Sequence, residues 1–232
     1  KSPYTGGHCN RVPELTMMVA EAVCHQKIGP LTDFYMDEKD KYELSVAGWL
    51  HDCGKIATPE YVMDKAVKLE TIFDRIALVD CRIELAKSEI KNQYQEKIIQ
   101  SLKQGQDIDL LEQQFENKLA ELDDDREFLR KANIGGEFMT PDDQQRVKDI
   151  TNKHHVTIAG EKQPLLTENE IINLSVARGT LIAEEREIIN NHMRVTIDML
   201  NSLPFPKHLR KVPEYAGGHH EKMDGTGYPN GL

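Results

Sequence analysis

Apolar side chains recur every three or four residues along much of this chain, which is the spacing of one face of an α-helix. Residues 8–25, 39–52 and 183–202 each present such a face. A further helix is predicted to begin at Thr58-Pro59-Glu60, because proline suits a first helical position. The pattern therefore predicts helices at both ends of the chain.

The middle of the chain, from 84 to 131, is rich in charge and carries two apolar stripes. Ile83, Ala86, Ile90, Tyr94, Ile98 and Leu102 form one stripe, and Leu111, Phe115, Leu119 and Leu122 form the other. A Gln-Gly-Gln turn at 104–106 separates the two. We predict an antiparallel helical hairpin at about 70–131 whose two stripes face each other, within an insertion that spans 66–170.

A short helix is predicted from Pro141 to about Lys153, and residues 156–183 have the composition of a loop. Alternation typical of a strand is not convincing anywhere in the chain. The predicted fold class is therefore all-α.

Composition narrows the possible partners. The formal net charge is −10 and there is no basic run, which argues against a partner of long nucleic acid. No apolar stretch is long enough for a membrane segment, and the first residues do not form a signal peptide. The four cysteines form no CxxC pair, which favours free thiols in a reducing cytoplasm.

Histidines supply the candidate chemistry. His51-Asp52 and His219-His220 are adjacent pairs, while His8 and His192 lie on apolar helix faces. Imidazole and carboxylate ligands together suit Mn, Fe, Ni or Zn. Neighbouring helical side chains diverge by about 100°, so an adjacent pair can reach two ions, and a carboxylate can bridge them. Two such ions can clamp a phosphoryl group and activate water.

Each of these features has an ordinary alternative. A single histidine on an apolar face is more often a core residue, and short histidine pairs such as His154-His155 occur in loops. Only the combination favours a metal site.

Four segments resemble motifs of a known family. His51-Asp52-Cys53-Gly54-Lys55 resembles the HDxGK motif of HD-superfamily phosphohydrolases. Residues 219–229, HHEKMDGTGYP, resemble the HHExxDGxGYP signature of the HD-GYP subfamily. Residues 8–12 resemble its opening H-x-x-R-V element, and 185–192 resemble its E-R-x-x-I-x-x-H segment. The resemblance covers about half of the chain, at both ends.

The resemblance implies an HD-type helical bundle that hydrolyses cyclic di-GMP or a mixed cyclic GMP-AMP to the linear dinucleotide and then to mononucleotides. It assigns His8, His51 and Asp52 to one metal ion, and His192, His219 and His220 to a second ion that Asp52 bridges. It gives catalytic roles to Asp52 and Lys55. The substrate-binding or GYP-loop residues would be Arg11, Asp224, Gly225, Gly227, Tyr228 and Pro229.

Two departures from the family pattern qualify these expectations. Tyr4 stands where some members with three metals have glutamate, so two ions (Fe, Mn or Ni, with Zn as an alternative) are expected rather than three. The family's last aspartate ligand would lie beyond Leu232, so 1–232 is interpreted as an HD-GYP domain that is incomplete at its C-terminal end.

Other functions are also compatible with this sequence. A non-hydrolysing cyclic-dinucleotide sensor or a docking module could share the fold, whereas the 219–229 run argues against a mononucleotide phosphohydrolase. The insertion could be a homodimerisation arm, a lid, a docking surface for a regulatory partner, or a self-contained decoration whose stripes pack only on each other.

Overall fold

The computed structural model describes residues 3–232, with side chains from Gly6 onward, so the side chain of Tyr4 lies outside the described residues. The predicted all-α class is confirmed, with one small two-stranded sheet added. The chain forms two compact units. One combines the residues up to Asp64 with Ala183–Leu232, and the other consists of Lys65–Ile182.

The first unit contains the helices from both ends of the chain. They are α1 (Pro3–Cys24), α2 (Glu38–Leu50), η1 (Cys53–Ala57), α3 (Glu60–Met63), α8 (Ala183–Asn190), α9 (His192–Asn201), η2 (Lys207–Leu209) and α10 (Val212–Gly217). Within this unit α1 packs on α2, η1 on α9, and α10 on both α2 and α9. Ala47, Leu200, Val212 and Ala216 form its small apolar core.

The predicted helices 8–25 and 39–52 are present as α1 and α2, and α2 begins with a capping box at Asp37. The helix predicted for 183–202 is present as α8 and α9, which only Asn191 separates. Asn191 keeps right-handed helical angles, with a φ of −62° and a ψ of −16°, and its N–H still bonds to the carbonyl of Glu187 at 3.0 Å. The division places His192 at the start of a new helix.

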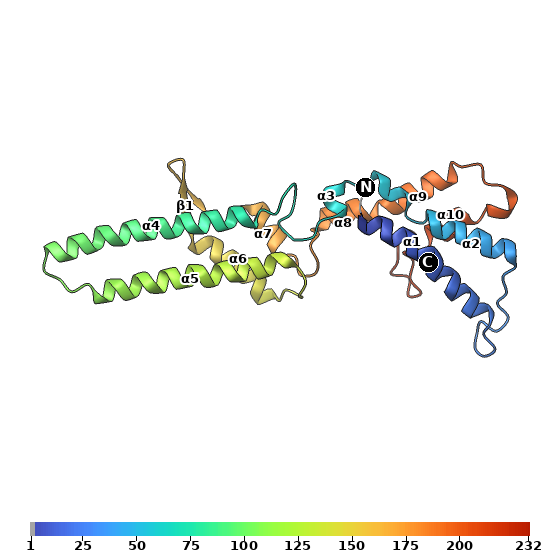
Figure 1. Cartoon of the computed structure of the whole chain (residues 1–232), viewed down its shortest axis with the longest axis horizontal. Helices are drawn as coiled ribbons and strands as arrows, with labels where there is room; N and C mark the ends of the chain where they lie inside the picture. Colours follow the sequence, from blue (N-terminus) through green and yellow to red (C-terminus); the bar gives the residue numbers. More distant parts are fainter. Residues whose placement is uncertain (1–2) are drawn as a thin grey trace. The chain divides into compact units, whose positions relative to one another are not determined.

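The second unit contains the predicted hairpin, formed by α4 (Ile76–Lys103) and α5 (Asp109–Ile134), which run side by side (Figure 1). Tyr94 and Phe115, from the two predicted stripes, stack with ring centroids 4.3 Å apart. Gly105 in the turn has a φ of +66°, which favours glycine. The hairpin ends at Ile134, the last residue of α5, slightly beyond the predicted residue 131.

The loop predicted for 156–183 is wrong. Strands β1 (His155–Ile158) and β2 (Glu161–Pro164) form an antiparallel hairpin, and α7 (Glu168–Leu174) follows. Only Val156 of the eight strand residues is buried, so the alternation was too short to recognise. Helix α7 begins with a capping box of Thr167 and Glu170, a local signal that the sequence does contain.

The hairpin is not self-contained. It shares one apolar core with α6 (Pro141–Lys153), the β-hairpin and α7. The fully buried members of this core include Val79, Ile83, Leu122, Leu129, Val147, Val156, Leu165, Leu166 and Leu174. Because Leu174 belongs to it, the compact unit continues to Ile182 rather than ending at the predicted 170.

The described helices include none that is both long and apolar enough to cross a membrane. All four cysteines are free thiols.

We expect that residues 65–182 can be replaced by a short Gly/Ser linker without unfolding the first unit. Within that unit α3 contacts α8, so the two new ends lie near each other. Replacing only 84–131 should instead give an aggregated or partly unfolded chain, because it removes Leu122 and Leu129 from a shared core, at about 2–5 kcal/mol for each side chain. Size-exclusion chromatography and far-UV circular dichroism of both variants test this; the reverse outcome would show that the two units are not independent.

Candidate metal centre

The carboxylate of Asp52 lies at the centre of a histidine cluster in the first unit. Its Oδ2 is 3.3 Å from Nε2 of His8 and 3.1 Å from Nε2 of His51. Its Oδ1 is 3.3 Å from Nε2 of His192 and 3.6 Å from Nε2 of His219. The Asp52 side chain is only 1% exposed. One buried carboxylate therefore directs one oxygen to each of two histidine groups.

Close helix packing brings these residues together. His8 lies on α1 and His51 directly follows α2, and a Cβ on Gly48 would be only 3.2 Å from Cα of Pro13. The two helices can therefore approach closely enough for Nε2 of His8 and Nε2 of His51 to lie 3.2 Å apart.

Three of the histidines are held in the same way by the main chain. Nδ1 of His51 donates to the carbonyl of Gly48 at 2.7 Å, and Nδ1 of His219 donates to the carbonyl of Ala216 at 2.7 Å. Nδ1 of His192 donates to the carbonyl of Ile189. In each case the acceptor is three residues earlier. A proton on Nδ1 leaves the Nε2 lone pair directed at Asp52.

With these ring orientations, hydrogen-bond acceptors face each other: the Nε2 lone pairs of the histidines and the carboxylate oxygens of Asp52. Oδ1 of Asp52 and Nε2 of His192 are buried, and neither makes a hydrogen bond to any described residue. Lone pairs on imidazole nitrogens and on a carboxylate repel each other unless a positive charge lies between them. The donor set therefore fits a divalent cation, for which neutral imidazole and carboxylate are common ligands.

Two groups of three residues have ligand atoms that all lie within 4.8 Å of one another: His8, His51 and Asp52, and His192, His219 and His220. His220 stacks on Tyr228 with ring centroids 4.6 Å apart. Burial and the neighbouring His219 and His192 lower the pKa of His220 to about 4, so its ring is neutral and available as a ligand at neutral pH.

The electrostatics of Asp52 favour its ionised form. Burial alone would raise the pKa of this carboxyl, but hydrogen bonds donated by protonated His192, His219 and His51 would hold that pKa far below the usual range, so the ionised carboxylate calls for positive charge on the histidine side. Burial tends to lower the pKa of His51 and its contacts with Asp52 outweigh this, so that pKa is raised. Burial lowers the pKa of His8.

Lys55 also meets the carboxylate. It lies on η1, half-buried, and its Nζ donates to Oδ2 of Asp52 at 2.7 Å. Arg11 is exposed on α1, near enough for its charge to add to the lowering of the His8 pKa.

Gly54 and Thr196 are two further site residues that the sequence argument did not select. The backbone N–H of Gly54 donates to Oγ1 of the fully buried Thr196 at 2.9 Å. A Cβ on Gly54 would lie 2.1 Å from the carbonyl oxygen of His192 and 2.5 Å from N of Thr196. Only glycine therefore allows η1 to pack directly on α9. The glycine of the HDxGK segment was the available signal for this contact.

The GYP loop is a compact turn anchored to the site by His220, whose carbonyl accepts from the backbone N–H of Tyr228 at 3.2 Å. Oδ1 of Asp224 accepts from both N and Oγ1 of Thr226, and Gly225 has a φ of +71°. The exposed Asp224 thus shapes the turn. The loop also includes Pro229.

Close approach explains the second glycine of this loop. A Cβ on Gly227 would meet the backbone of Glu221 and Lys222 at 2.4–2.6 Å. The carboxylate of Glu221, which the sequence argument did not select, accepts from N of Asn230 at 2.7 Å and from N of Leu232 at 3.0 Å.

The six predicted metal ligands and Lys55 therefore lie together, whereas Asp224 and Gly225 form a turn of the adjoining loop. His154, interpreted from the sequence as a loop residue, is buried in the second unit. Its Nε2 lies 2.9 Å from Oδ2 of Asp125, whose Oδ1 accepts from Arg146 at 3.0 Å.

Among known protein families, the model of the HD domain matches residues 166–232 of this chain. This match supports the HD superfamily of metal-dependent phosphohydrolases, and with it binding of divalent metal. It includes His192, His219 and His220. No curated protein and no solved structure matches the chain.

Gly54→Ala should destabilise the first unit by about 3 kcal/mol, because the new methyl group meets backbone atoms that cannot rotate away. It should also separate η1 from α9 and reduce the bound metal per chain. Gly6→Ala is the matched control, since nothing lies within 4 Å of its added Cβ. Thermal unfolding and metal analysis of both variants provide the test, and equal behaviour of the two would show that the contact is unimportant.

Proposed function

We propose that this chain is a metal-dependent phosphodiesterase of the HD-GYP kind that hydrolyses a cyclic dinucleotide. The substrate would be cyclic di-GMP or a mixed cyclic GMP-AMP, and the product the linear dinucleotide, followed by mononucleotides on a second hydrolysis. The HD-domain match supports a metal-dependent phosphohydrolase, and the 219–229 run supports the narrower substrate class. A cytoplasmic location and a homodimer or regulatory partner bound through the insertion belong to the same hypothesis.

One observation carries the proposal. The two oxygens of Asp52 face different histidine groups, with His8 and His51 beside Oδ2 and His192 and His219 beside Oδ1. A structural site for a single ion does not need a carboxylate that is shared in this way. The arrangement fits two ions bridged by Asp52, the kind of centre that acts on phosphodiesters.

The proposed ligands divide into two sets. His8, His51 and Asp52 would hold one ion, and His192, His219 and His220 would hold the other with the second oxygen of Asp52. Fe, Mn or Ni is proposed, with Zn as an alternative. Divalent ions in these sets would supply positive charge that stabilises the developing negative charge on phosphoryl oxygens and makes water more acidic.

The chain's own residues would orient the reaction. The main-chain carbonyls behind His51, His192 and His219 fix the direction of the three rings. Lys55 is the cationic side chain at the centre, and its ammonium can move from Asp52 to a phosphate oxygen by rotation of its flexible stem. Arg11, exposed on α1, would attract the anionic substrate to a chain whose net charge is otherwise −10.

A panel of nucleotides tests the proposed function directly. The purified protein loaded with Mn²⁺ or Fe²⁺ should hydrolyse cyclic di-GMP or cyclic GMP-AMP to a linear dinucleotide, and 3′,5′-cyclic mononucleotides should remain intact. Removal of the metal with EDTA should abolish this activity, and added Mn²⁺ should restore it.

Two results would contradict the proposal. Tight binding of a cyclic dinucleotide without hydrolysis in the metal-loaded chain would favour the sensor. Hydrolysis of mononucleotides alone would favour a different phosphohydrolase.

Asp52→Ala should lose more metal than His8→Ala, because Asp52 faces both histidine groups whereas His8 belongs to one. We expect close to complete metal loss in the first variant and about half in the second. Metal stoichiometry after gel filtration measures this, with circular dichroism to verify folding. Equal loss in the two variants would argue against a bridging carboxylate.

Lys55→Met should retain its metal but hydrolyse about a hundredfold more slowly, because a protonated lysine does not ligate a metal. Its matched control is Lys41→Met, since Lys41 forms only a surface ion pair with Glu38 in the same unit. If Lys55→Met lost its metal, Lys55 would instead be a structural partner of Asp52.

A further inference from the structure

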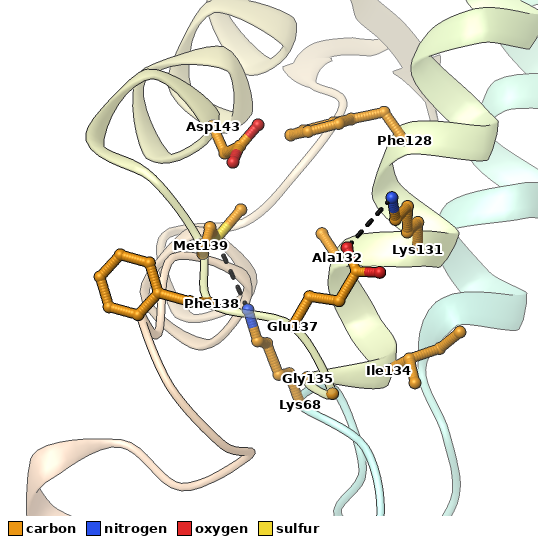
Figure 2. A pocket seen from close by; sticks show the side chains of 11 residues that line it. Lys68, Phe128, Lys131, Ala132, Ile134, Gly135, Glu137, Phe138, Met139 and Asp143 are labelled. Carbon is orange, nitrogen blue, oxygen red and sulfur yellow. Dashed lines mark hydrogen bonds and ion pairs between the residues drawn. The ribbon is translucent and has the colours of Figure 1, made fainter.

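The second unit contains a pocket of about 250 Å³ between the end of α5 and the start of α6 (Figure 2). Phe128, Ala132, Ile134, Phe138 and Met139 supply its apolar lining, and Lys68, Lys131, Glu137 and Asp143 its charged groups. All of these residues belong to the Lys65–Ile182 unit, and none is a candidate metal ligand. The proposed phosphodiesterase activity assigns no role to this pocket.

Lys68 is the unusual member of the lining, because it is a lysine only 1% exposed. Its Nζ donates to the carbonyl of Leu174 at 2.9 Å and lies 3.5 Å from Sδ of Met139, the contact drawn in Figure 2. Its backbone N–H donates to the carbonyl of Asn133 at 2.8 Å, which fixes its position. Among the described residues, no carboxylate forms an ion pair with it.

A buried ammonium that contacts only a carbonyl and a thioether is poorly compensated. Burial lowers the pKa of Lys68, while the charge of Asp143 acts in the opposite direction. Lysine is rarely buried without a charged partner. An anionic group inside the pocket would supply the partner that the protein does not.

Asp143 offers the complementary charge. Its Oδ2 accepts from both the backbone N–H and the hydroxyl of Thr140, at 3.0 and 2.7 Å, and these bonds lower its pKa. Its Oδ1 makes no hydrogen bond to any described residue. The other two charges are already paired, since Lys131 and Glu137 form an exposed ion pair at 3.1 Å. Within the described part of the chain, the pocket therefore presents one ammonium group without an ion-pair partner, that of Lys68, and one carboxylate oxygen without a hydrogen bond, Oδ1 of Asp143.

We propose that this pocket binds a small zwitterion with an apolar body, the chemistry of a free apolar α-amino acid. The ligand's carboxylate would meet Lys68, its ammonium would meet Asp143, and its side chain would pack on Phe128 and Phe138. The size is suitable, because a cavity of roughly 150 Å³ holds benzene and this pocket adds room for the two charged groups.

The charge pattern discriminates against simpler ligands. A plain carboxylate of the same shape could meet Lys68, but it would leave Asp143 without a cationic partner and add a second negative charge near it. A plain amine would leave Lys68 uncompensated and add a second cation to the pocket. A ligand that carries both charges gives Lys68 an anionic partner and Asp143 a cationic one. In a partly buried site each charged group needs a partner of opposite charge.

Isothermal titration of the full chain with three probes of one shape tests the proposal. L-Phenylalanine should bind at least about tenfold more tightly than 3-phenylpropionate, which lacks the ammonium, or 2-phenylethylamine, which lacks the carboxylate. Equal affinity for the three, or no binding of L-phenylalanine at millimolar concentration, would overturn the proposal.

Three variants identify the groups involved. Lys68→Met and Asp143→Asn should each weaken the binding of L-phenylalanine at least about tenfold. Lys68→Met should also make the affinity for L-phenylalanine equal to that for 2-phenylethylamine. Lys131→Met is the matched control at the exposed pair and should change the affinity less than twofold. Methionine has nearly the shape of lysine, so the Lys68 variant should fold, and Asp143→Asn gives an independent test if it does not. Equal losses in the Lys131 and Lys68 variants would also overturn the proposal.

Discussion

A buried carboxylate surrounded by imidazoles is the interaction on which the first unit depends. The groups that face Asp52 favour its ionised form by lowering the pKa of its carboxyl, yet its side chain is almost completely buried. A buried anion of this kind is costly unless positive charge compensates it. Lys55 compensates one oxygen, whereas Oδ1 faces two histidines without a hydrogen bond. The surrounding elements, including the direct packing of Gly54 on α9, serve to hold those histidines in place.

The two units are stabilised by different means. The first has a small core of residues such as Ala47 and Val212, and its centre is polar. The second has a long continuous apolar core, from Leu69 to Leu174. Because a bound ion stabilises only the state that binds it, the stability of the first unit should be linked to metal concentration, and that of the second should not.

The sequence predicted the elements with strong local signals. The two stripes, the turn at Gly105 and the proline at the start of α6 were sufficient for three helices. The residues that surround Asp52 were proposed because four segments of the sequence resemble motifs of a known family; His51-Asp52 and His219-His220 stand out as adjacent pairs, whereas His8 and His192 do not. The interruption at Asn191 was missed because it involves a single residue. The short β-hairpin was missed because only Val156 of its strand residues is buried, which leaves no alternation to recognise. The buried Lys68 could not be found, because lysine in a sequence indicates exposure.

The division of the first unit into two distant segments has a consequence for its synthesis on the ribosome. His8, His51 and Asp52 emerge early, but their partners on α9 and beyond α10 follow only after the whole of Lys65–Ile182. At translation rates of about 5–20 residues per second, the delay is on the order of ten seconds. During that interval the inner unit has time to complete its own core, while His8, His51 and Asp52 stand without the three histidines that follow it in the sequence. The nascent chain therefore exposes an incomplete set of the proposed ligands until translation has passed His220.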